Sequence, residues 1–176
     1  MFFNKSLADL SETTGVICFS KAWNNPVLWS HYGDKHKGIC LGFDLPDKSV
    51  VPVNYEPKRL QIDMKKDFDE GKFGQEKMLR ILATKFKDWQ YEDEARVFYR
   101  LEESDSLTGL FYKDFGDDLL LKEVIIGPRC HFGVSDLYNI LTKYKDEVKV
   151  IASRLAYRSF KVIEKRVRKR VKRKNA

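Results

Sequence analysis

The chain has 176 residues, of which 43% are hydrophobic and 13% aromatic, which is enough to bury one substantial core. Its apolar runs fall well short of the roughly eighteen residues that a membrane-spanning helix needs, so the sequence predicts no membrane span. The formal net charge of +7 is uneven, because residues 154–176 hold eleven Lys or Arg and one acid, whereas residues 1–153 hold 22 basic and 25 acidic side chains. This distribution excludes a basic nucleic-acid-binding surface spread over the whole globular part.

The first part of the chain predicts a strand, a helical turn and a second strand. Residues 16–19 form an apolar run of strand length. Asn25 followed by Pro26 is typical of a helix start, since the missing N–H of proline costs nothing at the first helical position. Glycines enclose a polar turn at 33–38, and residues 39–43 form the second apolar run. The tryptophans, histidines and tyrosine of this stretch favour a site packed between two core strands.

The middle of the chain predicts a strand, a long helix and another strand. Residues 50–55 are expected to form a strand at an edge or a bulge, because Pro52 cannot donate to a ladder. Between residues 73 and 89 apolar side chains recur every three or four positions, the pattern of an amphipathic helix. From residue 91 to residue 101 the period becomes two, as in a strand with one face on a core.

The last third of the chain predicts two more strands and a second helix. A long loop with a short strand at 110–112 precedes a strongly apolar strand at 119–126. Ser135 is expected to cap a helix that runs to Tyr144. Residues 148–152 form a further strand.

Together these elements predict an α+β fold. We expect a single domain of residues 1–155 around a mixed, mostly antiparallel sheet with two main helices. Residues 156–176 form a basic C-terminal extension. Its apolar residues from position 160 onward lie three or four apart, so the tail is predicted to be a basic helix with a narrow apolar stripe.

The cysteines and histidines do not follow the spacing of a metal site or a nucleophile pair. Cys18 and Cys40 lie inside apolar strands and are expected to be reduced core residues; with no signal-peptide pattern, the protein is predicted to be cytoplasmic. His31 and His36 fit helical metal ligation poorly, so no metal is expected. Sequence neighbours such as Ser30 and His31 rarely form a nucleophile–base hydrogen bond.

Three motifs are distributed along the chain. The first is Trp-Ser-His-Tyr at 29–32, followed by His-Lys-Gly at 36–38 and Gly-Phe-Asp at 42–44. The second is Trp-Gln-Tyr-Glu-Asp-Glu-Ala-Arg at 89–96, and a weaker third is Val-Ile-Ile-Gly at 124–127. These motifs resemble those of a bacterial family, the domain of unknown function 2971. The resemblance covers roughly residues 14–152 and implies that the family's usual N-terminal segment, with a Tyr-rich strand and an Asn-Asp-Pro motif, is absent or shortened.

Glu92, Glu94 and Arg96 alternate where the strand at 91–101 begins, so a period of two places all three on one face. Three charges in a row cannot form an apolar core face. They either lie in solvent with cross-strand ion pairs, or they line a cleft in which Arg96 holds a carboxylate by a forked hydrogen bond.

A Glu-x-Glu pair that enters a strand after a helix is similar to the arrangement in ADP-ribosyltransferases. The similarity implies that Glu94 is catalytic and stabilises positive charge on the nicotinamide ribose, with Glu92 assisting and Arg96 beside them. It also implies NAD as cofactor and an enzyme of toxin or phage-defence type. The candidate NAD-binding residues are His31 by hydrogen bond, Tyr32 and Trp29 by stacking, and Ser20.

The basic tail supports an alternative from another class, a non-enzymatic nucleic-acid-binding module in which the motif residues are structural. A solvated extension, an anionic membrane surface and an acidic partner protein are the other interpretations of this tail. The oligomeric state is left open. The candidate nucleic-acid-binding residues are Lys165, Arg166, Arg168, Lys169, Arg170, Lys172 and Arg173.

Overall fold

A computed structural model of the protein describes residues 12–61, 75–142 and 148–166. The chain separates into two compact units, residues 1–22 with 45–118 and residues 23–44 with 119–176. Helices mixed with mostly antiparallel strands confirm the predicted α+β class. Within the described ranges, every helix is too short or too polar to cross a membrane.

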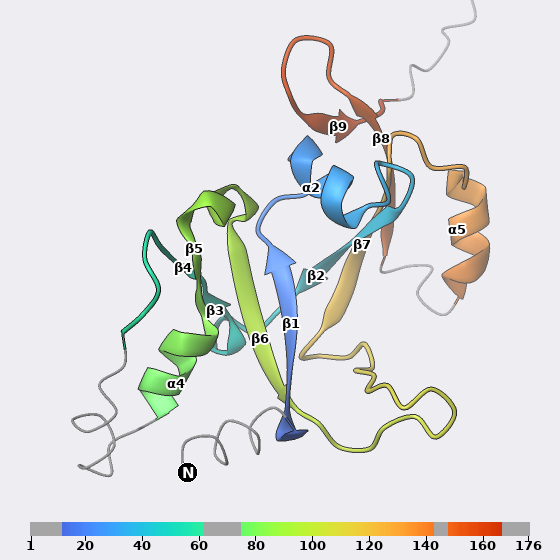
Figure 1. Ribbon diagram of the computed structural model, residues 1–176. Helices are drawn as coiled ribbons and strands as arrows, with labels where there is room; N and C mark the ends of the chain where they lie inside the picture. The colour runs from blue at the N-terminus through green and yellow to red at the C-terminus, as the bar shows by residue number, and fades with distance from the viewer. Residues whose placement is uncertain (1–11, 62–74, 143–147, 167–176) are drawn as a thin grey trace, which may run out of the picture. The chain divides into compact units, whose positions relative to one another are not determined.

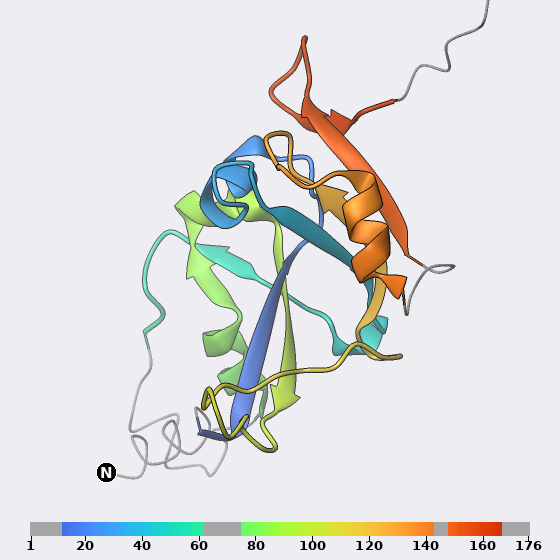
Figure 2. The ribbon, with the colours of Figure 1, turned by 90° about the vertical axis from the view of Figure 1, so that its right-hand side faces the viewer.

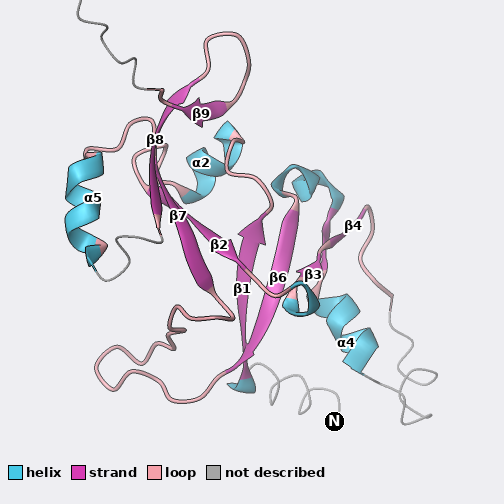
Figure 3. Ribbon diagram, turned by 180° about the vertical axis from the view of Figure 1, so that it is seen from behind, coloured by secondary structure: helices cyan, strands magenta, loops and turns pink. Residues whose placement is uncertain are grey.

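The centre of the first unit is a three-stranded sheet with the order β1-β6-β3 (Figure 3). Its strands are β1 (Thr14–Ser20), β3 (Val51–Pro52) and β6 (Glu94–Arg100). β1 and β6 are antiparallel, and their register places Ser20 opposite Glu94. Ala95 and Val97 of β6 are buried, in agreement with the predicted period of two. Pro52 lies on an edge strand, as expected for a residue without an N–H.

A two-stranded parallel sheet and a helix complete the first unit. These elements are η1 (Asp47–Ser49), β4 (Asn54–Glu56), α4 (Gln75–Leu82), β5 (Thr84–Phe86) and η2 (Lys87–Glu92), in which η denotes a 3-10 helix. The strand expected at 50–55 is divided between β3 and β4. The N–H of Val53 donates to the carbonyl of Glu94 at 3.0 Å, whereas the N–H of Asn54 donates to the carbonyl of Ala83 at 2.7 Å, so the chain passes from one sheet to the other.

The prediction of one helix between residues 73 and 89 is wrong for its second half. The hydroxyl of Thr84 donates to the carbonyl of Arg80 at 2.6 Å, and β5 begins there and pairs with β4. Phe86 and Trp89, which continue the helical spacing in the sequence, are both partly exposed. Tertiary strand pairing overrides the local pattern in this segment.

The second unit is built on a four-stranded sheet with the order β2-β7-β8-β9 (Figure 1). Its strands are β2 (Ile39–Asp44), β7 (Leu120–Ile126), β8 (Lys149–Leu155) and β9 (Val162–Glu164). β7 and β8 are parallel and the other neighbours are antiparallel. The parallel pair requires a crossover. The crossover contains α5 (Val134–Ile140), which packs against β8 (Figure 2).

Successive residues of β7 point to opposite faces of this sheet and bury two hydrophobic clusters. Val124 and Ile126 belong to one cluster, which Leu137 of α5 covers. Ile125 belongs to the other, together with Trp29 of α2 (Pro26–Tyr32). Burial on both faces explains why the β7 sequence is apolar almost throughout.

The segment from α2 to β2 has the helix start and the tight turn that the sequence predicted. The side chain of Asn25 accepts a hydrogen bond from the N–H of Val27 at 2.9 Å, which caps α2. Residues 34–36 then adopt left-handed φ angles of 44°, 52° and 72° in succession. The N–H of Gly38 donates to the carbonyl of Gly33 at 2.8 Å and closes the turn. The turn is joined to the end of β7 because the N–H of Gly127 donates to the carbonyl of Gly38 at 3.0 Å.

Three predictions in the last third of the chain are wrong, and the first is the helix end, since α5 ends at Ile140 and not at Tyr144. α5 is capped at Gly133, whose N–H donates to the carboxylate of Asp136 at 2.7 Å, and not by Ser135. Residues 110–112 do not form a strand. They follow a turn in which the carboxylate of Asp105 accepts hydrogen bonds from the N–H groups of Leu107 and Thr108.

The described part of the basic extension is a loop, residues 156–161, followed by the strand β9, whereas the sequence predicted a helix from position 160 onward. Val162 of β9 has an exposed fraction of 0%, and its N–H donates to the carbonyl of Asn24 at 2.9 Å. Through Val162, β9 is therefore part of the core of the second unit. Residues 167–176 lie outside the described part of the chain.

We expect Gly127→Ala to destabilise the protein, because a Cβ at this position would lie 2.4 Å from the carbonyl oxygen of His36 and 2.6 Å from that of Gly38. Overpacking against backbone costs roughly 1–3 kcal/mol of unfolding free energy. The matched control is Gly116→Ala, whose nearest contact would be Asp118 at 3.8 Å. Equal thermal unfolding midpoints for the two variants would contradict this account of the turn.

Candidate active site

The candidate active site in the first unit is a cluster of two carboxylates and two cations, which we call the Lys85 cluster. Its members are Lys85 of β5, Glu92 of η2, and Glu94 and Arg96 of β6. The ammonium group of Lys85 donates to the carboxylate of Glu92 and, at 2.8 Å, to Oε2 of Glu94. Nε of Arg96 donates to Oε1 of Glu94 at 2.7 Å, and its Nη1 donates to the carbonyl of Leu82.

The two carboxylates of the cluster do not lie on an exposed strand face, so that interpretation of the sequence is wrong. Glu92 is 4% exposed and Glu94 is 6% exposed. Glu92 belongs to η2, because Asp93 adopts a left-handed φ of 43° and separates it from β6. The prediction that Glu92, Glu94 and Arg96 alternate along one strand is therefore wrong for Glu92, although the three charges do meet around Lys85.

Tryptophan and tyrosine rings adjoin the Lys85 cluster. The ammonium group of Lys85 lies 5.3 Å from the ring centroid of Trp89, a cation–π contact. The rings of Trp89 and Tyr91 are tilted with their centroids 5.9 Å apart. The hydroxyl oxygen of Tyr55 accepts a hydrogen bond from the N–H of Glu94 at 2.8 Å. The Trp-x-Tyr-Glu-x-Glu-x-Arg motif thus surrounds one lysine that is not part of the motif.

Two residues of β1 lie beside the cluster. The register pairs Ser20 with Glu94 and Cys18 with Arg96, so all four side chains share one side of the sheet. The hydroxyl of Ser20 donates to the carbonyl of Glu92 at 2.7 Å. Cys18 is exposed, which corrects its assignment to the core, and the register places it beside Arg96.

The cluster holds Glu94 in its ionised form. Burial alone would raise the pKa of Glu94, but hydrogen bonds from Arg96, Lys85 and Cys18 outweigh it and lower the pKa to about 2. The pKa of Lys85 is raised, because its bonds to Glu92 and Glu94 outweigh the cost of burial. Burial and the bond to Glu94 raise the pKa of the Cys18 thiol, which keeps it protonated at neutral pH.

The other candidate NAD-binding residues lie in the second unit. Trp29 is buried, and its indole N–H donates to the carbonyl of Trp23 at 2.6 Å, so it packs in the core and its ring is not open to the stacking that the sequence predicted. His31 and Tyr32 are exposed at the end of α2, with ring centroids 6.1 Å apart in an edge arrangement. The predicted residues are thus divided between the two units.

A Ser30–His36 contact was missed by sequence reasoning, which considered Ser30 only with its neighbour His31. Nε2 of His36 lies 3.2 Å from Oγ of Ser30, and the Ser30 hydroxyl donates to the carbonyl of Pro26 at 3.1 Å. The hydroxyl has one proton, so it cannot donate to the Pro26 carbonyl and to Nε2 of His36 at the same time. The buried Nδ1 of His36 has no partner among the described residues.

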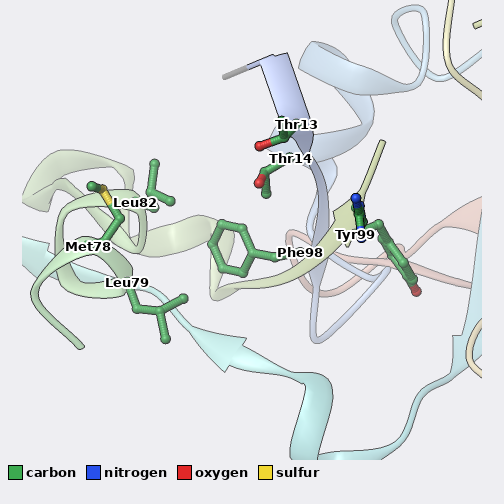
Figure 4. A pocket seen from close by; sticks show the side chains of 8 residues that line it. Thr13, Thr14, Met78, Leu79, Leu82, Phe98 and Tyr99 are labelled. Carbon is green, nitrogen blue, oxygen red and sulfur yellow. The ribbon is translucent and has the colours of Figure 1, made fainter. Parts of the chain in front are cut away.

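A pocket of about 500 Å³ opens on the first unit, between α4 and the end of β6 that is remote from Glu94 (Figure 4). None of the predicted site residues lines it. Its β6 residues are Phe98, Tyr99 and Arg100, in the second half of the strand, and Leu82 in its lining accepts the hydrogen bond from Nη1 of Arg96. The lining residues are Thr13, Thr14, Met78, Leu79, Leu82, Phe98, Tyr99 and Arg100.

Two further predictions concern metal ligands and the basic tail. In the ranges that the structure describes, no group of three or more His, Cys, Asp or Glu could hold a metal ion. Of the basic residues proposed to bind nucleic acid, Lys165 and Arg166 are described and follow β9. The remainder lie outside the described residues: Arg168, Lys169, Arg170, Lys172 and Arg173.

Comparison with known proteins identifies one family. Residues 28–97 match the model of a family described as protein of unknown function DUF2971. The matched region includes the Lys85 cluster, His31 and Tyr32. A search of curated proteins and a search of solved structures each found no match.

Acid should reveal the contribution of Glu94 to stability. Its pKa is lowered from 4.5 to about 2, so its stabilisation is complete above pH 4.5 and is lost as the pH falls toward 2. Linkage sets this contribution at about 3 kcal/mol of unfolding free energy. Denaturant unfolding at several pH values should show that Glu94→Gln is less stable at pH 7 and loses less stability in acid.

The matched control for this titration is Glu103→Gln, because Glu103 is exposed in the loop that follows β6. It should reproduce the wild-type pH profile. Parallel pH profiles for wild type and Glu94→Gln would show that the Lys85 cluster does not depend on the charge of Glu94.

Proposed function

We propose that this protein, whose residues 28–97 match the family described as protein of unknown function DUF2971, is an NAD-dependent, ADP-ribosyltransferase-like enzyme with Glu94 as the catalytic carboxylate. The observation that carries the proposal is the state of Glu94, a carboxylate at the start of a strand, next to a second glutamate, held in place on both oxygens and kept ionised. As in the sequence-based hypothesis, the enzyme is of toxin or phage-defence type and acts in the bacterial cytoplasm.

The proposed step breaks the glycosidic bond between the ribose C1′ and nicotinamide. The bonding electrons leave with nicotinamide, and positive charge develops on the ribose ring. A fixed, ionised carboxylate stabilises that charge without reorganising during the reaction. Electrostatic stabilisation of this type is usually the largest contribution to the rate enhancement of an enzyme. The oxygen of an acceptor hydroxyl, or of water, then bonds to C1′. Its proton passes to Glu92, the second carboxylate of the Lys85 cluster.

The neighbours of Glu94 suit the other parts of the dinucleotide. Lys85 and Arg96 are both partly exposed cations, with side-chain exposures of 22% and 19%, and cations beside the carboxylate favour a diphosphate. Trp89 is the tryptophan next to the carboxylates and is partly exposed, so it replaces Trp29 as the ring proposed to stack on nicotinamide. His31 and Tyr32, the other proposed NAD-binding residues, belong to the second unit and are given no role in this step.

Replacing Glu94 by Gln should lower nicotinamide release from NAD by about a hundredfold or more, since removing one electrostatic stabiliser typically costs this much. Release would be followed by chromatography on the purified full chain, with thermal stabilisation by NAD measured beside it. Glu103→Gln serves as the control and should retain wild-type release. The chain must remain folded, so unfolding midpoints are recorded for each variant.

Glu92→Gln provides a second variant if Glu94→Gln does not fold. It removes the assisting carboxylate and leaves Glu94 paired with Lys85 and Arg96. Wild-type protein that is neither stabilised by millimolar NAD nor able to release nicotinamide would overturn the proposal.

A second candidate function is nucleic-acid binding through the basic extension, favoured by its ten basic residues against one acid. A truncation that tests it must begin after Arg166, because Val162 is part of the core. Such a truncation should weaken binding to any DNA or RNA and leave NAD chemistry unchanged. Unchanged affinity for a duplex at low salt would exclude the residues beyond 166 as the binding segment.

A further inference from the structure

The loop between β8 and β9, residues 156–161, contains aromatic and basic residues that do not pack in the core of the unit. The N–H of Ala156 donates to the carbonyl of Lys161 at 2.9 Å and closes the loop. β8 and β9 pair antiparallel directly below it, with Leu155 opposite Val162. In Figures 1 and 3 the loop extends past the paired ends of the two strands. We call residues 156–161 the β8–β9 loop.

Two aromatic side chains of the β8–β9 loop are almost completely exposed. Tyr157 is 92% exposed and Phe160 is 97% exposed. Neither ring contributes to the two hydrophobic clusters of this unit. Large rings presented to water without packing against the protein are typical of a surface that stacks on a ligand.

Basic residues flank the two rings along the chain, and one of them contacts Tyr157. The guanidinium carbon of Arg154 lies 4.8 Å from the ring centroid of Tyr157, and its Nη1 donates to the carbonyl of Leu155 at 3.0 Å, so this cation is fixed against the ring. Residues 154–166 hold a single acid, Glu164. The basic residues of the same range are Arg154, Arg158, Lys161, Lys165 and Arg166.

We propose that the β8–β9 loop binds single-stranded nucleic acid. Bases stack on Tyr157 and Phe160, and the surrounding Lys and Arg contact phosphates. Stacking rings combined with a basic path is the recognition mode of proteins that bind single strands without sequence preference. The inference depends neither on the proposed NAD chemistry nor on residues beyond 166.

Hydrogen bonds and a buried side chain hold the base of the loop in place. Such preorganisation favours binding, because the loop loses little conformational entropy when a ligand binds. Val162 is fully buried directly after the loop, and its N–H is bonded to the carbonyl of Asn24. The N–H of Lys165 donates to the carbonyl of Ala152 at 2.8 Å. The rings are therefore displayed on a hairpin that the core of the unit holds in place.

The arrangement fits a single strand better than a membrane or a duplex. Arg158 lies between the two rings in sequence, so inserting both rings into hydrocarbon would take a cation with them, which is costly. The remaining residues between the rings and β8 or β9 are small or polar. A duplex offers no unstacked base to the rings, whereas a single strand alternates bases and phosphates.

The test measures binding of the full chain to fluorescent oligo(dT) and oligo(U), with a duplex of the same length for comparison. Tyr157→Ala and Phe160→Ala should each weaken single-strand binding between about fivefold and about a hundredfold, the range of base–aromatic stacking. Neither substitution changes the charge, so a loss cannot arise from weaker electrostatic attraction. Tyr157→Phe keeps the ring and should bind as wild type does.

The matched control is Phe132→Ala, which removes a partly exposed ring of the same unit outside the loop. It should leave the affinity unchanged. The loop variants should unfold at the wild-type temperature, because their side chains are not packed. The proposal is overturned if the ring variants bind oligo(dT) as wild type does, or if wild type binds duplex and single strand equally. It is also overturned if anionic phosphatidylserine vesicles, and not oligonucleotides, distinguish wild type from the variants.

Discussion

Lys85 makes it possible to bury Glu92 and Glu94 in the first unit. Two carboxylates removed from water would repel each other, and one of them would take up a proton. The ammonium group between them, with Arg96 on the far oxygen of Glu94, allows Glu94 to remain ionised. This arrangement joins β5, η2 and β6, so one set of ion pairs both orders the unit and preserves the charge that the proposed chemistry needs.

The second unit depends on a backbone constraint of a different kind. Its turn after α2 contains three successive residues with left-handed φ, and the carbonyls of His36 and Gly38 accept hydrogen bonds from the N–H groups that follow β7. Only a residue without a Cβ fits at Gly127. The Trp-Ser-His-Tyr and His-Lys-Gly segments therefore have a structural role, with Trp29 in the core and His36 in the turn.

The charges of the chain are used in two different ways. In the Lys85 cluster they are buried and neutralise one another, whereas around the β8–β9 loop they share one sign and accompany exposed rings. The first arrangement suits a reaction that needs a fixed local charge, and the second suits a polyanion with flat bases. A carboxylate site and a separate nucleic-acid-binding loop would be compatible in one protein, since neither uses residues of the other.

The sequence by itself determined the α+β class, the α2 start at Asn25, the turn that follows it, and the strands β1, β2, β6, β7 and β8, because these depend on local periodicity and on Gly and Pro stereochemistry. It also pointed to Glu92, Glu94 and Arg96 as a group. Only the tertiary structure decided where helix α4 ends, since strand pairing between β4 and β5 overrode a helical spacing.

The tertiary structure also supplied Lys85, which lies inside the expected helix and carries no motif signal, and it made a strand of β9 where the tail predicted a helix. Each of these outcomes rests on hydrogen bonds or ion pairs between residues far apart in sequence. Local patterns do not encode such contacts, which is why they appeared only in the folded chain.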